Sequence, residues 1–153
     1  MRKVGVLLLA AVILLAAGCA AADEVVRLPE SRYAVTLPDG MVFEGPTPEN
    51  SEAFACVYEE LLLEIHFFRF EAGMTEAVAD VLAKGAEDIT PVPVNGIDMI
   101  AFRYPAQDDG WKAVGYMTQD GDATQMILFW YGSTEAAEMT KTIMESIGET
   151  ETV

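Results

Sequence analysis

The chain has 153 residues, of which 25 are acidic and 9 are basic, so its formal net charge at pH 7 is −16. This charge argues against a nucleic-acid-binding protein, because phosphate binding relies on Lys and Arg side chains that release counterions. The length suits one ordinary domain with a short leader, and such a domain buries enough apolar surface to fold without disulfide bonds.

The first 22 residues have the layout of a secretory signal peptide. Arg2 and Lys3 precede a run, residues 4–17, that has no charged or hydrogen-bonding side chain. As a helix this run would reach about 21 Å, less than the roughly 30 Å hydrocarbon core of a bilayer. Removal of residues 1–22 would leave 7 basic and 25 acidic residues, a net charge of −18. That charge opposes adhesion of the domain itself to anionic lipid.

Cys19 interrupts a run of small residues where the apolar segment ends. Ala17 and Gly18, directly before it, resemble the lipobox of bacterial lipoproteins, although Ala16 stands where a larger aliphatic residue is usual. The resemblance implies cleavage before Cys19 and a diacylglycerol on its sulfur. We therefore expect an exported lipoprotein that is anchored to the bacterial cell membrane through Cys19. Two alternatives stay open: cleavage after residues 20–22, which gives a soluble secreted protein, and an uncleaved anchor.

The exported part is predicted to be a linker at residues 23–32 and a single α+β domain at residues 33–149. The domain opens with an alternating apolar and polar segment at residues 33–38. The turn dipeptide Asp39-Gly40 and a second apolar segment at residues 41–45 follow. This order predicts a β-hairpin.

Two apolar stretches follow the polar loop at residues 46–53. The first, residues 54–58, contains Cys56, which we expect to be a buried, unreactive thiol because free cysteine is often buried and no Cys-His motif is present. Without Cys19, Cys56 would be the single remaining cysteine, so the mature domain would have no internal disulfide. The second stretch, residues 61–70, should be a strand with Leu61, Leu63, Ile65 and Phe67 on a dry face and Leu62, Glu64, His66 and Phe68 on a mixed face.

Two segments change from strand to helix periodicity. The first predicts a helix at residues 76–84, capped by Thr75 and ended by Gly85, with Val78, Ala79 and Leu82 as its apolar face. The second predicts a helix at residues 135–147, capped by Ser133 or Thr134 and ended by Gly148. Its apolar stripe is expected to be Ala136, Met139, Ile143 and Ile147.

Four strands joined by three short turns lie between the helices and predict an antiparallel meander. The last strand contains "MILFWY", and no single alternation buries all of it, so Phe129, Trp130 or Tyr131 should lie on a less buried face. We expect Trp111 and Trp130 to border a groove that binds a ligand or partner, because large rigid aromatic side chains provide contact area at low entropic cost. The four strands are predicted at residues 89–94, 97–105, 111–119 and 123–132.

This order of elements predicts an α+β fold, an antiparallel sheet of about six to eight strands flanked by two amphipathic helices. The segment "YAVTLPDGMVF" at residues 33–43 resembles the opening element of the PsbP/Mog1-like family, and residues 134–147 resemble its closing helix. The resemblance implies the sandwich of that family. Its members serve as photosystem accessory proteins or as nuclear-transport GTPase partners. Neither role suits an exported lipoprotein, and a fold does not fix a function.

Catalytic motifs are absent from the sequence: it has no G-x-S-x-G, H-E-x-x-H, glycine-rich phosphate loop or C-x-x-C. Glu64 and His66 share one strand face, which gives the alternative function, a small secreted metal-dependent hydrolase, if a third carboxylate joins them. The acidic turns at residues 108–110 and 120–122 lack the ligand spacing of an EF-hand, and turn geometry explains them.

We therefore expect a non-enzymatic, membrane-tethered binding or accessory module of the cell envelope. It should be a monomer with no cofactor, no metal and no nucleic-acid partner. Its expected partners are the membrane, through the N-terminal lipid, and another envelope protein.

Overall fold

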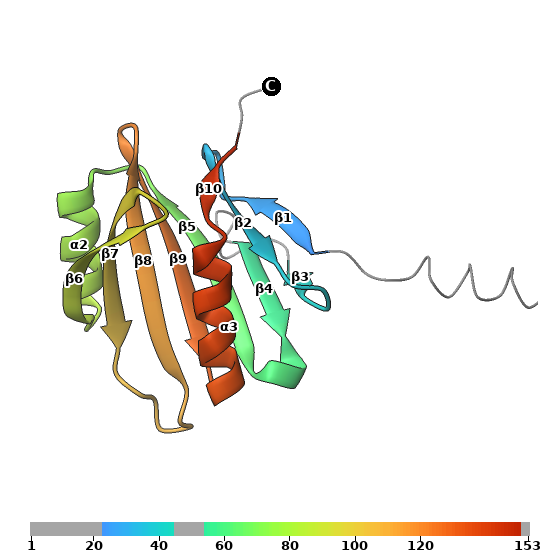
Figure 1. The fold of residues 1–153 in the computed structure, drawn as a ribbon. Coiled ribbons are helices and arrows are strands. Elements are labelled where there is room, and N and C mark those ends of the chain that lie inside the picture. Colours follow the sequence, from blue (N-terminus) through green and yellow to red (C-terminus); the bar gives the residue numbers. More distant parts are fainter. Residues whose placement is uncertain (1–22, 45–53, 151–153) are drawn as a thin grey trace, which may run out of the picture.

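The computed structural model describes residues 23–44 and 54–150 and arranges them in two antiparallel sheets. The larger sheet has seven strands and contains the predicted meander, whose last strand pairs with β5. It runs across the molecule from β6 at one edge to β3 at the other (Figure 1). In spatial order its strands are β3 (Val42–Glu44), β4 (Phe54–Tyr58), β5 (Leu63–Phe70), β9 (Ala123–Tyr131), β8 (Lys112–Asp120), β7 (Ile97–Tyr104) and β6 (Glu87–Val94).

Turn and edge chemistry explain the meander. Asn95 and Gly96 both have positive φ, +50° and +77°, which suits the tight turn between β6 and β7. Strand β6 carries Pro91 and Pro93, and it lies at the sheet edge, where a missing N–H breaks no internal ladder. The helices and the two antiparallel sheets together confirm the α+β class predicted from the sequence.

The smaller sheet has the order β1 (Glu24–Arg27), β2 (Tyr33–Leu37) and β10 (Gly148–Glu149). The predicted hairpin between β2 and β3 is wrong, because β2 pairs with β1 and β10 whereas β3 pairs with β4. Tyr33, Val35 and Leu37 are buried in the core, and this burial requires β2 to lie over the large sheet rather than in it. The turn at Gly40, with φ of +90°, carries the chain from one sheet to the other.

The smaller sheet includes residues at both ends of the domain, before Tyr33 and after the last helix. Strand β1 lies within residues 23–32, which the sequence assigned to a linker, so the fold begins upstream of Tyr33. At the other end Gly148 follows the last helix and is the first residue of β10. The backbone N–H of Thr150 donates to the carbonyl oxygen of Arg32 at 2.6 Å, which fixes the end of this strand.

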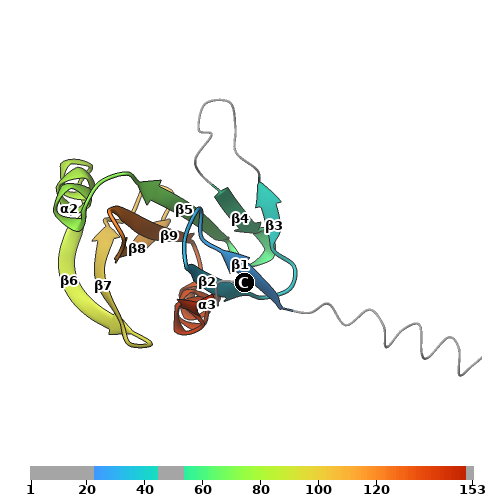
Figure 2. The ribbon, with the colours of Figure 1, turned by 90° about the horizontal axis from the view of Figure 1, so that it is seen from above.

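Helices α2 (Met74–Ala83) and α3 (Thr134–Glu145) lie on opposite sides of the large sheet (Figure 2). The predicted cap of α3 is confirmed: the Ser133 hydroxyl accepts a hydrogen bond from the Ala136 N–H at 3.0 Å, although the helix ends at Glu145 rather than at residue 147. Ala136, Ile143 and Ile147 are buried as expected and Met139 is half-buried, whereas Thr140 and Met144 are buried in addition. A short 3-10 helix, η1 (Glu59–Leu61), joins β4 to β5, so the observed strand starts at Leu63 rather than at Leu61 as predicted.

Helix α2 differs from its prediction in its cap and its buried face. Gly73 is the N-cap, and the Met74 N–H donates to the Gln119 side-chain oxygen at 2.9 Å, so Thr75 does not cap the helix. Ala77 and Val81 are buried, whereas Ala79 is exposed and Leu82 is 50% exposed. Seven of the ten residues of this helix are apolar and they lie on more than one side of it, so its sequence indicated a helix but left the direction of its contact with β8 and β9 undetermined.

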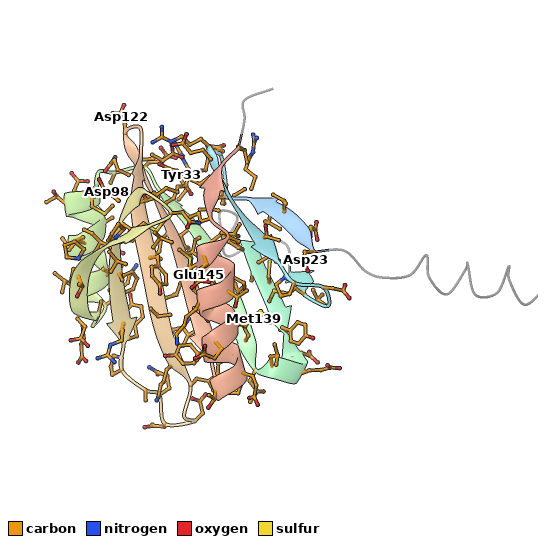
Figure 3. All side chains as sticks on the ribbon, viewed as in Figure 1. Asp23, Tyr33, Asp98, Asp122, Met139 and Glu145 are labelled. Atoms are coloured by element: carbon orange, nitrogen blue, oxygen red, sulfur yellow. The ribbon has the colours of Figure 1, made fainter. Side chains whose placement is uncertain are left out.

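The sheet separates two cores. Strand β5 alternates as predicted, with Leu63, Ile65 and Phe67 buried on the α3 side. On the α2 side, Phe102, Met117 and Met126 pack against Ala77 and Val81 of the helix. Charged side chains lie on the outside, for example Asp122 at the tip of the β8–β9 turn and Glu145 on α3 (Figure 3).

Candidate functional site: an open sheet face

Helix α2 covers only part of its side of the large sheet, where it packs on β8 and β9. Next to the C-terminal end of the helix, one row of cross-strand neighbours crosses six strands from β3 to β7. Trp130 and Tyr104 of this row pack against the α2-side core, so the row faces the α2 side. In order, its members are Val42, Val57, Glu64, Trp130, Ala113 and Tyr104.

Within residues 23–44 and 54–150 no second helix covers this area, and we call the row together with Leu62, His66 and Trp111 the open sheet face. Val42 is 64% exposed and Leu62 is 46% exposed, and both tryptophans are half-buried. Large apolar side chains in contact with solvent over several strands are unusual for a sheet that has a helix on each side. The open sheet face is therefore the strongest candidate for a functional surface.

An aromatic platform forms the centre of the open sheet face. The rings of Tyr104 and Trp130 are nearly parallel, 5° apart in orientation, with centroids 6.2 Å apart. Ala113 lies between them in the row and is buried. Burial is the main cause that raises the pKa of the Tyr104 phenol above its ordinary value. At pH 7 the platform therefore presents two neutral aromatic rings.

Gly115, beneath the platform, allows the Phe102 ring to lie close to the sheet backbone. A Cβ at Gly115 would lie 2.1 Å from Phe102 Cζ, so the Phe102 ring occupies the space above the bare backbone. Phe102 in turn packs edge-on against Tyr104, with centroids 5.5 Å apart. Gly115 thus lets Phe102 lie deep enough to support Tyr104 from below.

The second predicted tryptophan lies at the same end of the sheet. A Cβ at Gly132 would lie 3.3 Å from both Leu62 Cβ and Trp111 Cε2, so these two side chains flank a bare stretch of backbone. Gly132 directly follows the last residue of β9, and Trp111 comes two residues before Ala113, the cross-strand neighbour of Trp130. The structure therefore brings Trp111 and Trp130 to one end of one sheet face.

Glu64 and His66 also lie on the open sheet face. The His66 Nε2 and Glu64 Oε2 atoms are 3.3 Å apart, and the side chains are 29% and 43% exposed. The His66 ring stacks on Phe68, with centroids 6.1 Å apart. No group of three or more His, Cys, Asp and Glu side chains suited to a metal occurs within residues 23–44 and 54–150. A catalytic zinc ion takes three protein ligands, and this pair supplies two.

The acidic turns have structural partners in this fold. The Asp109 carboxylate accepts a hydrogen bond from the Trp111 N–H at 3.0 Å. The Asp120 carboxylate accepts one from the Ser31 hydroxyl at 2.7 Å. Both carboxylates therefore stabilise the chain around the turns, in line with the turn-geometry interpretation of the sequence.

Two hollows border the open sheet face. The first, about 270 Å³, is lined by Val42, Val57 and Tyr58 together with the exposed glutamates Glu59 and Glu60 of η1. The second, about 380 Å³, is lined by Tyr104, Leu128 and Trp130 and by Lys84 at the end of α2. Sequence reasoning missed Val42, Val57 and the two glutamates, because their place on the same face as Trp130 depends on the pairing of β3, β4, β5 and β9.

The remaining residues that the sequence singled out are Cys56, Cys19 and the apolar signal segment. Cys56 is a free, fully buried cysteine, as predicted, and burial raises the pKa of its thiol to about 12. Cys19 and the signal segment lie outside the described residues. In the part of the chain that the structure describes, no helix is long and apolar enough to cross a bilayer.

Neither a protein-family model nor a curated protein matches this chain. Several solved structures are similar, among them these two. A Bacteroides thetaiotaomicron VPI-5482 protein, known from a crystal structure at 1.50 Å, has a TM-score of 0.62 and 10% identity, over 86% of this chain and 50% of that one. The chain thus spans half the length of that protein. The solution structure of cyanobacterial PsbP (CyanoP) from Synechocystis sp. PCC 6803 has a TM-score of 0.60 and 7% identity, over 87% and 96% of the two chains.

At these identities the likeness shows the fold and not the activity. The CyanoP alignment covers nearly the whole of both chains, which agrees with the family resemblance found in residues 33–43 and 134–147. The chain has a PsbP-like α+β fold.

Proposed function

We propose that this protein is an exported lipoprotein whose folded domain is a non-enzymatic binding module of the bacterial cell envelope. The observation that carries the binding role is the open sheet face, where half-buried aromatic side chains lie beside the C-terminal end of α2 and keep part of their surface in contact with solvent. Large apolar side chains that gather on one face and stay in contact with solvent mark interaction sites in soluble domains. The proposal assigns Glu64 and His66 to this binding face rather than to a metal-dependent hydrolase.

The sequence supports the membrane tether. Strand β1 begins at Glu24, five residues after Cys19. Five extended residues span at most about 18 Å, so a lipid on Cys19 would hold the folded domain next to the bilayer. Two acyl chains of a diacylglycerol anchor a protein far more firmly than one. The partner of the open sheet face is accordingly a protein at the same membrane.

Replacing Cys19 with serine tests the tether. We expect the wild-type protein to enter the detergent phase of a Triton X-114 separation and to incorporate labelled fatty acid in cells. The Cys19→Ser protein should do neither, because the acylation chemistry requires the thiol. Cys56→Ser is the matched control and should behave as the wild type, since Cys56 is buried in the domain. Equal labelling and cleavage of the wild type and Cys19→Ser would contradict the tether.

A further inference from the structure

We infer that the open sheet face binds a cationic amphipathic segment of a protein partner. The apolar side of that segment would lie on the platform of Tyr104 and Trp130, and its Lys or Arg side chains would reach Glu59, Glu60 and Glu64. The inference deepens the proposed function, and it rests on that function only for the partner's location at the membrane.

The shape of the face fits an elongated occupant. Strands in a sheet lie about 4.8 Å apart, so a row across six strands extends about 24 Å. A helix of about 16 residues has this length, at 1.5 Å per residue. One hollow lies at the Val42 and Val57 end of the row and another at the Tyr104 and Trp130 end, and the exposed side chains of Val42 and Leu62 add apolar surface. A helix in a groove binds such a surface through its apolar side.

The charges of the face indicate a cationic occupant. Glu64 stands in the middle of the row, and Glu59 and Glu60 line the hollow at its β3 end. Neither Glu59 nor Glu60 forms an ion pair with another of the described residues. Lys84, at the opposite end, is already paired with Asp80 at 2.7 Å. The face therefore presents negative charge beside apolar surface.

The charge of the whole domain favours a cationic partner over an anionic lipid surface and over a second copy of the chain. The exported part carries −18, which steers a cationic partner toward it and repels anionic lipid headgroups. A second copy of the chain would bring the same −18 to the interface. Complementary charge determines partner choice and association rate more than it determines affinity. The glutamates should therefore chiefly raise the rate of association, and this effect should weaken as salt is added.

A designed peptide tests the inference directly. The probe is a fluorescent, amphipathic 16-residue helix of Leu and Lys, titrated against residues 23–153, which contain every element that the structure describes, with circular dichroism as a check of folding. Fluorescence anisotropy should show binding that weakens as salt is raised. Two control peptides, one with Glu in place of Lys and one with the Leu and Lys order scrambled, should bind at least about tenfold more weakly, a difference of about 1.4 kcal/mol.

Variants then locate the binding site. Trp130→Ala and Leu62→Ala should each weaken binding, with Trp130→Ala costing about tenfold or more because a large aromatic at the centre of an interface carries much of its energy. The control is Leu82→Ala, which removes an equally exposed leucine on α2. Glu59→Lys with Glu60→Lys should weaken binding and flatten its salt dependence, whereas Glu145→Lys on α3, on the other side of the sheet, should change it little.

Several results would overturn the inference. These are equal binding of the Lys and Glu peptides, equal losses in Glu145→Lys and in the Glu59/Glu60 variant, or unchanged binding after both Trp130→Ala and Leu62→Ala. Binding of the domain to phosphatidylglycerol vesicles, or a dimer that Trp130→Ala dissociates, would also overturn it. Peptide binding is independent of the lipid, so its failure leaves the Cys19 tether standing, and failure of the tether leaves peptide binding standing.

Discussion

Gly115→Ala is expected to lower the free energy of unfolding by about 3 kcal/mol or more, the upper range for overpacking of a core. The added Cβ would lie 2.1, 2.4 and 2.7 Å from three ring atoms of Phe102. Phe102 is fully buried between the sheet and α2, so its ring has no space into which it can withdraw. Urea unfolding of residues 23–153, followed by circular dichroism, measures the loss.

Two variants make this result specific. Gly148→Ala is the matched control and should change stability little, because no atom lies within 4 Å of its added Cβ. Phe102→Leu, combined with Gly115→Ala, should recover part of the loss, since the smaller side chain vacates the space that the new methyl needs. A Gly115→Ala protein about as stable as Gly148→Ala would show that Phe102 does not fill this position.

The Cys56 thiol is expected to react about a thousandfold more slowly in the folded protein than in the unfolded chain. The pKa of the thiol rises from 9.0 to about 12 through burial, and the thiolate is the reactive form. At pH 8 a thiol with a pKa of 9 is about 10% ionised and one with a pKa of 12 about 0.01% ionised. Reaction with a disulfide reagent at pH 8, with and without guanidinium chloride, gives both rates. Rates within tenfold of each other would contradict the burial of Cys56.

The same shift makes stability depend on alkaline pH. Because the folded-state pKa lies above the unfolded value, the stabilisation is complete below pH 9 and is lost as the pH rises from 9 toward about 12. The slope is about 1.4 kcal/mol per pH unit in that window. Tyr104 and Tyr116, whose pKa values burial also raises, titrate at high pH as well. The difference between the wild type and Cys56→Ala isolates the cysteine.

Local sequence signals predicted the meander and helix α3 correctly. Asn95-Gly96 is a turn that few other dipeptides make, and Ser133 has a direct hydrogen-bonding role at the start of α3. The equally clear turn signal at Asp39-Gly40 was misleading. Whether that turn joins two paired strands or two different sheets is decided by the burial of β2 over the large sheet, which involves residues far away in the sequence.

The candidate site was predictable only in part. The crowding of aromatic residues near Trp111 and Trp130, and the mixed face that carries Leu62 and Glu64, were visible in the sequence. Their assembly into one surface depends on the order of strands β3, β4, β5 and β9 and on the limited reach of α2. Neither property follows from local periodicity, because neighbours in the row can be far apart in the sequence. Glu64 and Trp130, for example, are about 66 residues apart along the chain.

Photo-crosslinking in intact cells tests the central claim, that the open sheet face binds a protein partner at the membrane. Benzoylphenylalanine would replace Trp111 in the full-length chain and, as the control, Glu145 on α3. We predict one discrete adduct from position 111 that Glu59→Lys with Glu60→Lys removes and Cys19→Ser reduces, with no such adduct from position 145. No adduct from position 111, or the same adducts from both positions, would contradict the account.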